Sequence, residues 1–251
     1  IDAPMYYVAL MTFVLIFSSV TMVLAVDAGH HMQKSKVTFY MLLTVIGGAI
    51  FVGSQAWEWK NFIKGEYGAL ETKGGQILQF VNADTGKRAA IQEFAQGIDS
   101  PRTTHQLSNG IWYKSETSLP TVSLAEVNKG FAATSNLVIR TEQLDEKGRK
   151  VVLSRAESLL KIQDATIVVE GANLIRNEYG NRLFADFFFF ITGFHGFHVF
   201  SGVVLLIILL INTIMGTYER RGHYEMVEKI GLYWHFVDLV WVFVFTFFYL
   251  V

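Results

Sequence analysis

Residues 187–216 read FFFFITGFHGFHVFSGVVLLIILLINTIMG, a stretch without a charged side chain. A helix needs about 20 apolar residues to cross a bilayer core about 30 Å thick. Three other stretches, at residues 5–26, 37–57 and 230–251, have the same character, and a single carboxylate interrupts the last of them. Because a soluble protein rarely buries four such helices, the sequence predicts four transmembrane helices.

The composition agrees with a membrane protein. Hydrophobic residues make up 51% of the 251 residues, and charged residues only 17%, against about 25% in soluble domains. The formal net charge of −1 argues against a nucleic-acid-binding protein, which would carry a basic excess. The chain has no cysteine, which excludes disulfides, thiolate metal sites and a cysteine nucleophile.

The two short connections between these stretches predict the orientation. Both are basic, and their cationic residues are Lys34, Lys36, Arg220, Arg221 and Lys229. Short loops rich in Lys and Arg stay on the cytoplasmic side of a membrane. We therefore expect both chain ends and the long middle segment on the outside, which is the periplasm if the membrane is a bacterial inner membrane.

The chain accordingly divides into three parts. Residues 1–57 hold the first two membrane helices, residues 58–182 form an extracytoplasmic insertion domain, and residues 183–251 hold the last two helices. A segment of this length is enough for one small domain, and long segments cross the membrane regardless of their charge. The expected fold is an all-α polytopic bundle with an inserted outer domain.

The inserted segment has a mixed pattern. Two strands are expected at residues 136–142 and 150–155, joined by a turn in which Gly148 takes a positive φ. Residues 166–175 indicate a further strand, and residues 89–96 a short helix. The sequence therefore predicts an α/β domain.

Two histidines, His195 and His198, lie near the middle of the third membrane stretch. Polar groups at that depth are costly and are functional candidates, which makes haem or metal ligation one interpretation. One helix cannot supply both axial ligands of a haem, and His235 is the one candidate partner from another span. At about 1.5 Å per residue, His235 lies roughly 10 Å inside the cytoplasmic boundary and His198 roughly 24 Å inside, so their depths differ. We therefore favour hydrogen bonding between helices or to a partner subunit.

Small residues surround these histidines. Gly193 and Gly196 flank His195, and small residues let helix backbones approach closely in lipid. The pattern predicts a tight, polar packing seam. We expect no catalytic, cofactor-binding or metal-binding residue in this chain.

Two carboxylates are further candidates. Asp238 follows His235 by one helical turn, and a buried carboxylate needs a partner. A pair with His235 or with another chain would stabilise it, and a proton-relay role is the functional alternative. Glu58 stands between Trp57 and Trp59, where the second helix leaves the membrane. Two interpretations of Glu58 stay open: its side chain packs against a neighbouring subunit, or it is simply solvated.

Several of these strings resemble subunit III of haem-copper oxidases, the cytochrome c oxidase subunit III family. Residues 188–199 (FFFITGFHGFHV), after Tyr179-Gly180, are similar to the sixth of the family's seven helices, and residues 233–241 (YWHFVDLVW) to the last. Residues 55–59 (QAWEW) resemble the end of the fifth helix, and residues 18–30 more weakly the fourth. The order and orientation agree with those inferred from charge.

Two departures from the family accompany this resemblance. The first three family helices have no counterpart here; they are missing from this sequence, supplied by another chain, or absent from a shortened form. The family also has only a short loop where residues 58–182 stand.

The resemblance implies an accessory role without an active site in this chain. Subunit III binds no haem or copper; these belong to partner subunits I and II. It binds phospholipid and supports assembly, stability and proton uptake of the catalytic subunit. The complex would reduce oxygen in aerobic respiration, coupling electron transport to proton translocation.

Several alternatives stay open. A quinol oxidase or a nitric oxide reductase complex carries similar subunits. An independent haem-binding membrane anchor is a second alternative and a membrane receptor a third, although the cytoplasmic loops are too short for a signalling domain. We also expect the 58–182 insertion to contact cytochrome c or another respiratory complex.

Overall fold

The computed structural model describes residues 4–98, 107–108, 112–113, 120–173 and 175–250. The chain forms two compact units, a helical unit of residues 1–58 and 188–251 and an α/β unit of residues 59–187. Each unit is described by itself.

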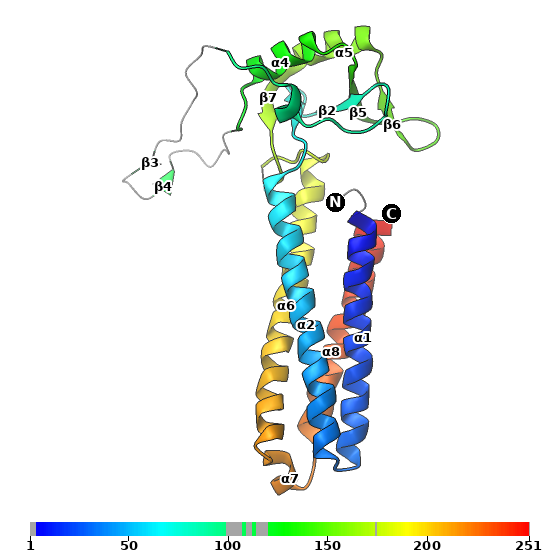
Figure 1. Ribbon diagram of the computed structural model, residues 1–251, viewed down its shortest axis with the longest axis vertical. Coiled ribbons are helices and arrows are strands. Elements are labelled where there is room, and N and C mark those ends of the chain that lie inside the picture. The colour runs from blue at the N-terminus through cyan, green and yellow to red at the C-terminus, as the bar shows by residue number, and fades with distance from the viewer. Residues whose placement is uncertain (1–3, 99–106, 109–111, 114–119, 174, 251) are drawn as a thin grey trace. The chain divides into compact units, whose positions relative to one another are not determined.

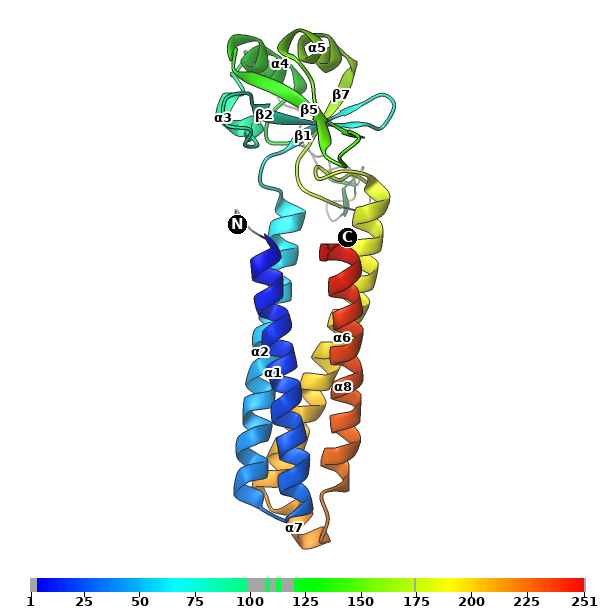
Figure 2. The same ribbon diagram turned by 90° about the vertical axis from the view of Figure 1, so that its right-hand side faces the viewer.

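Four long helices make up most of the helical unit (Figures 1 and 2). They are α1 (Pro4–His30), α2 (Lys34–Lys64), α6 (Arg182–Ile214) and α8 (Glu225–Phe245). All four are long and apolar enough to cross a membrane, which agrees with the expected helical bundle. The short helix α7 (Thr217–Arg221) lies between α6 and α8, and a π-helical turn, η2 (Thr246–Leu250), follows α8.

The interior of this bundle is built around two tryptophans of α8. Trp234 and Trp241 are fully buried, as is Phe51 of α2. Trp241 meets Phe51 edge to face at 4.7 Å between ring centroids. Since the two tryptophans are seven residues apart, they lie on one face of their helix. This face packs against α1 and α2, whereas phenylalanines such as Phe13 and Phe190 are exposed on the outside.

A five-stranded antiparallel sheet forms the centre of the α/β unit (Figure 2). Its order is β6-β5-β2-β1-β7. The strands are β1 (Ala69–Thr72), β2 (Ile77–Asn82), β5 (Leu137–Leu144), β6 (Lys150–Val152) and β7 (Ala165–Val169). Strands β3 (Leu107–Ser108) and β4 (Trp112–Tyr113) pair separately. The mixed α/β character expected of the insertion is confirmed.

Short helices cover one face of the sheet. They are α3 (Ile91–Phe94), α4 (Leu124–Ala133), α5 (Arg155–Lys161) and the 3₁₀ turn η1 (Ile162–Asp164). Phe80 of β2 packs against Phe94 and Phe131 at 4.8 and 5.4 Å between ring centroids. Capping boxes at Ser123 and Ser154 begin α4 and α5. The apolar core of the unit lies between these helices and the sheet.

The local predictions for the insertion have mixed outcomes. The β5–β6 hairpin is present, and Gly148 in its turn has φ of 72°. The short helix at 89–96 is confirmed as α3. The strand expected over 166–175 was too long, because β7 ends at Val169 and Gly171 takes a positive φ, which an extended strand does not accommodate.

Candidate functional site

His195 joins two helices in the interior of the bundle. Its side chain is buried, and its Nε2–H donates to the backbone carbonyl of Val237 in α8 at 3.0 Å. The ring lies 5.1 Å from that of Trp241 and 5.9 Å from that of Phe51. Nδ1 is buried and has no hydrogen-bond partner among the described residues. His195 therefore adopts the Nε2–H tautomer and ties α6 to α8.

His198 behaves differently, although it lies less than one turn away. Its Nδ1 hydrogen-bonds to the carbonyl oxygen of Phe194 in the same helix at 2.8 Å. The rings of Phe194 and Phe197 flank it at 4.6 and 5.9 Å. The His198 backbone carbonyl accepts from the Tyr233 hydroxyl of α8 at 3.2 Å, so the two motif histidines differ in their rings: the His195 ring bonds to another helix, and the His198 ring bonds within its own helix.

His235 and Asp238 both face α1. The Nδ1 of His235 lies 2.6 Å from the hydroxyl oxygen of Ser19, and Asp238 interacts with the same hydroxyl. The Oδ1 of Asp238 is buried and has no hydrogen-bond partner in the described part of the chain. The histidine and the carboxylate are therefore grouped around one serine.

Glu58 is held on both of its oxygens. Gln55 donates to Oε2 at 2.9 Å, and the hydroxyl of Tyr249 donates to Oε1 at 2.8 Å. Nearby, the Tyr7 hydroxyl donates to the carbonyl of Ser54 at 3.1 Å. These contacts join α2 to η2, the turn that follows α8, and to α1.

The glycines of the expected seam differ in what surrounds them. Gly193 is half-buried, and a Cβ added at Gly196 would meet no atom within 4 Å. At Gly202, by contrast, a Cβ would lie 3.0 Å from the Trp234 ring, and at Gly48 it would lie 2.7 Å from that ring and from Val203. Gly48 and Gly202 are therefore positions at which the Trp234 ring packs directly against a helix backbone.

Sequence reasoning missed the hydrogen bonds that connect α1 to α8. The indole N–H groups of Trp234 and Trp241 donate to the hydroxyls of Ser18 at 3.1 Å and Thr12 at 2.9 Å. With Ser19 and His235, these residues form what we call the α1–α8 seam. The sequence contains a signal for these hydrogen bonds. The two tryptophans are seven residues apart, and the hydroxyl residues of α1 have a similar spacing, since Ser18 and Ser19 follow Thr12 by six and seven residues.

A second polar centre lies in the α/β unit, at the buried carboxylate of Glu178. It accepts backbone N–H groups of Glu66 at 3.2 Å, Tyr67 at 3.3 Å, Gly68 at 3.1 Å and Gly171 at 2.5 Å. The carboxylate thus holds the segments before β1 and after β7 together. Sequence reasoning did not find this residue, because its donors are all backbone groups.

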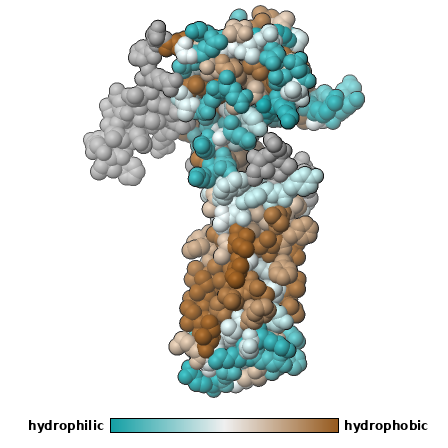
Figure 3. Space-filling model, in the orientation of Figure 1, coloured by the Kyte–Doolittle hydropathy of each residue, from teal (hydrophilic) through white to brown (hydrophobic). Residues whose placement is uncertain are grey.

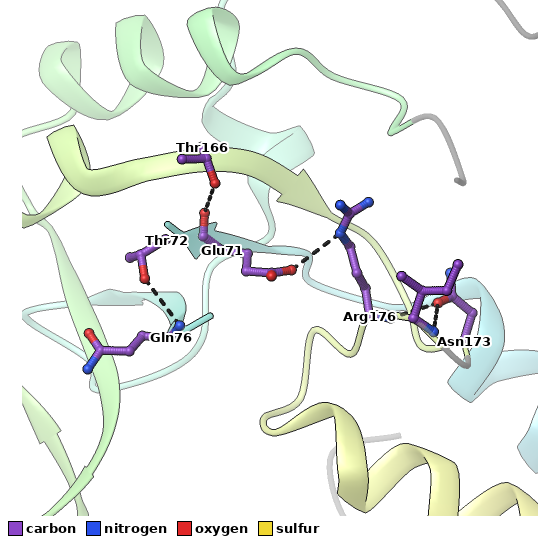
Figure 4. Close-up of polar contacts among 7 residues, drawn as sticks. Glu71, Thr72, Gln76, Thr166, Asn173 and Arg176 are labelled. Atoms are coloured by element: carbon purple, nitrogen blue, oxygen red, sulfur yellow. Dashed lines mark hydrogen bonds and ion pairs between the residues drawn. The ribbon is translucent and has the colours of Figure 1, made fainter. Parts of the chain in front are cut away.

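The return segment after β7 is also attached to the sheet through Arg176 (Figure 4). Its guanidinium lies 3.3 Å from the carboxylate of Glu71 in β1, and the backbone carbonyl of Glu71 accepts from Thr166 of β7 at 3.1 Å. Asn173 accepts the N–H of Arg176 at 2.8 Å. These contacts fix the loop that leads toward the neighbouring Tyr179.

Across the described ranges, no three His, Asp or Glu side chains are grouped closely enough to hold a metal ion. Several polar residues of the helical unit, among them His195, Trp234 and Trp241, instead make hydrogen bonds between helices. This arrangement supports helix packing.

Comparison with known proteins gives the family of the C-terminal part. Residues 173–251 match the family described as cytochrome c oxidase subunit III. This region contains α6 and α8, with His195, Trp234 and His235. The resemblance at residues 55–59 and 18–30 lies outside the matched region and stays a prediction.

Individual relatives agree. The chain is 44% identical over 64 residues to cytochrome c oxidase subunit 3 of Marchantia polymorpha, covering 26% of this chain and 24% of that protein. It is 42% identical over 79 residues to the subunit of Thermostichus vulcanus, covering 29% and 37%. It is 46% identical over 70 residues to that of Synechocystis sp., covering 28% and 30%.

The chain therefore spans about a quarter to about a third of the length of these relatives. The resemblance expected from the histidine and tryptophan motifs is confirmed: residues 173–251 of the chain match the cytochrome c oxidase subunit III family.

Proposed function

We propose that this chain is a non-catalytic, subunit III-type component of a respiratory haem-copper terminal oxidase in a bacterial inner membrane. The observation that carries the proposal is the family match over residues 173–251. That region supplies α6 and α8, the two helices joined by the His195–Val237 hydrogen bond. The complex would couple oxygen reduction to proton translocation.

The four long helices span the membrane in this proposal. Their outward-facing large side chains include Phe13, Phe190 and Phe236, all more than half exposed, which suits contact with lipid or a partner helix. The basic residues of the connections α1–α2 and α6–α8 favour a cytoplasmic position for both. Both chain ends and the α/β unit would then be periplasmic.

A groove on the helical unit supports the expectation of bound phospholipid. It encloses about 320 Å³ and is lined by seven residues of α1 and α2, with Gly47 among them. The others are Phe13, Val14, Phe17, Leu43, Ile46 and Ile50. Since none of these side chains is polar, the groove suits an acyl chain.

The role of the chain is to pack against subunit I, with subunit II in the same complex, and to support assembly, stability and proton uptake. The α1–α8 seam suits this role, because interhelical hydrogen bonds in a membrane give a bundle one defined packing. Cytochrome c is the proposed electron donor, with a quinol oxidase or nitric oxide reductase complex as the alternative. The α/β unit docks a donor or a neighbouring respiratory complex.

The test is to tag the chain, extract it in mild detergent and identify the co-purifying chains by mass. We expect a large, histidine-rich polytopic chain together with a copper-site chain that contains cysteine. Recovery of the chain alone would remove the accessory-subunit proposal. A haem spectrum from the chain alone would instead favour the independent anchor.

The contribution of the α/β unit is tested separately, by replacing residues 66–175 with a short linker. Unchanged assembly and unchanged electron-donor kinetics would remove the docking proposal. The control is a single exchange at an exposed residue of the same unit, Leu160→Asp, which leaves the fold of the unit in place.

A further inference from the structure

A pocket with cationic walls lies on the sheet of the α/β unit, beside β5 and β6. It encloses about 390 Å³. Three valines, one each from β2, β5 and β6, form its apolar part, and the turn after β2 closes one side. Its lining residues are Val81, Asn82, Ala83, Gly86, Val138, Arg140, Arg149, Lys150 and Val152.

The two inner cations of this pocket are bonded to neutral acceptors. Arg140 donates from Nε and Nη2 to the amide oxygen of Gln79 at 3.1 and 2.7 Å. Lys150 donates from Nζ to the backbone carbonyl of Tyr179 at 3.2 Å. Neither forms an ion pair with a carboxylate in the part of the chain that the structure describes. Each keeps further N–H donors, because a guanidinium has five and an ammonium three.

The charges of these cations repel one another. Burial lowers the pKa of Lys150, and the positive charge of Arg140 lowers it further. Arg88, whose guanidinium lies 4.5 Å from the centroid of the Tyr67 ring, has a pKa that burial lowers, that the charge of Glu178 raises and that Arg140 lowers. An anion at this position would relieve the repulsion.

The nearby carboxylates act on these cations from outside the pocket: the charge of Glu142 raises the pKa of Lys150, and that of Glu178 raises the pKa of Arg88. Glu178 accepts four backbone N–H groups, as described above, and Glu142 accepts the N–H of Ile77 at 3.2 Å. Arg149, at the rim, is paired with Asp145 at 3.0 Å. No described acidic side chain lines the pocket.

We propose that this pocket binds a phosphate ester, with the phosphate oxygens on Arg140 and Lys150 and the ester group on the valines. Cations that approach from separate strands suit a tetrahedral group with three acceptor oxygens. The apolar floor distinguishes an ester from inorganic phosphate. The site lies outside the residues that match the oxidase family, so it goes beyond the proposed function.

The test uses the full chain in a neutral detergent, titrated calorimetrically with phenyl phosphate and with inorganic phosphate. We expect saturable binding of both, tighter for phenyl phosphate. The double exchange Arg140→Gln/Lys150→Gln should weaken phenyl phosphate binding by at least about tenfold. The matched control, Lys73→Gln/Lys161→Gln, removes the same charge at another pocket of the unit and should change binding less than about twofold.

A second pair of variants keeps the test independent of folding. Arg140→Lys/Lys150→Arg preserves both charges and should retain binding, while Lys150→Gln alone should weaken it about threefold. Absence of saturable phenyl phosphate binding by the unchanged chain would overturn the proposal. Equal weakening by the two double exchanges would overturn it as well, and equal affinity for the two probes would overturn the role of the valines.

The source of the phosphate ester is a lipid headgroup or a free metabolite. The chain is placed in phosphatidylcholine nanodiscs with or without phosphatidic acid. Competition between phosphatidic acid and phenyl phosphate identifies the headgroup as the source, and undiminished phenyl phosphate binding identifies a free ester.

Discussion

The helical unit and the α/β unit both bury an apolar core, but they expose different kinds of surface. Large apolar side chains cover the outside of the helices, whereas the α/β unit is mostly polar outside and apolar within (Figure 3). In the helices the buried polar groups are single hydroxyls and ring nitrogens bonded across helices. In the α/β unit, the carboxylate of Glu178 accepts hydrogen bonds from four backbone N–H groups. The difference is the one expected if lipid surrounds the helices, as proposed above, and water surrounds the α/β unit.

The largest effect is expected at Glu178. In Glu178→Leu, four backbone N–H groups lose their acceptor, and at about 1–3 kcal/mol each the α/β unit should lose more than about 4 kcal/mol of stability. Amide hydrogen exchange of the full chain measures this, with α6 as the internal reference. The matched change at the exposed Glu146 should leave exchange unaltered. Unchanged protection of β1 and β7 would refute this account.

The next largest effect compares two equally exposed apolar residues. Phe13 of α1 and Leu160 of α5 are each 69% exposed. Phe13→Asp should cost about 3 kcal/mol of membrane insertion, while Leu160→Asp in water should stay within about 0.5 kcal/mol. The fraction of the chain integrated into membranes measures both. Equal outcomes would mean that the two residues face the same solvent.

A smaller effect sharpens the description of the bundle interior. Gly48→Ala places a methyl group 2.7 Å from Trp234 and Val203, and such overpacking costs about 1–3 kcal/mol. Gly53→Ala, in the same helix, meets no atom within 4 Å and should be neutral. Thermal unfolding in detergent measures both. A neutral Gly48→Ala would show that these helices are loosely packed.

The smallest effect concerns the β5–β6 turn. The Arg149 backbone N–H, with smaller contributions from the Arg149 side chain and Lys147, holds the pKa of Asp145 below its usual value. Because the folded-state pKa of Asp145 is lowered, its carboxylate stabilises the fold at pH values above 3.8, the pKa in the unfolded chain. This contribution disappears as the pH falls through the folded-state pKa. Exchange of the Arg149 amide should therefore accelerate in acid. Asp145→Asn should remove that pH dependence, and its persistence would assign the effect to another group.

Local patterns of the sequence predicted the four long helices and part of the α/β segment, whereas β1, β2, α4 and α5 were not predicted. The four helices, the β5–β6 hairpin and the α3 turn follow from hydrophobic runs and turn residues that act within a few positions. The strand predicted at 166–175 ends at Val169. The reason is that the Gly171 backbone N–H bonds to the carboxylate of Glu178, seven residues further on, and a strand pattern contains no information about this contact.

Partners within the site were less predictable. His195 and His198 look equivalent in the sequence, yet the His195 ring hydrogen-bonds to α8 and the His198 ring to its own helix. Gly196 was expected to be a packing position, yet a Cβ there would meet no atom within 4 Å. In each case the rotation of the helix about its axis decides the contact, and the residues of one helix alone do not fix that rotation.

The sequence by itself determined that the chain has four long apolar helices, an inserted α/β segment and the motifs of its family. These features depend on hydrophobicity, chain length and residue order, which are local. Only the tertiary structure decided that Ser19 meets His235, that Tyr249 meets Glu58 and that Glu178 collects its amides. Such contacts join residues far apart in the chain, and they form where the packing of whole helices and strands leaves each buried polar group one available partner.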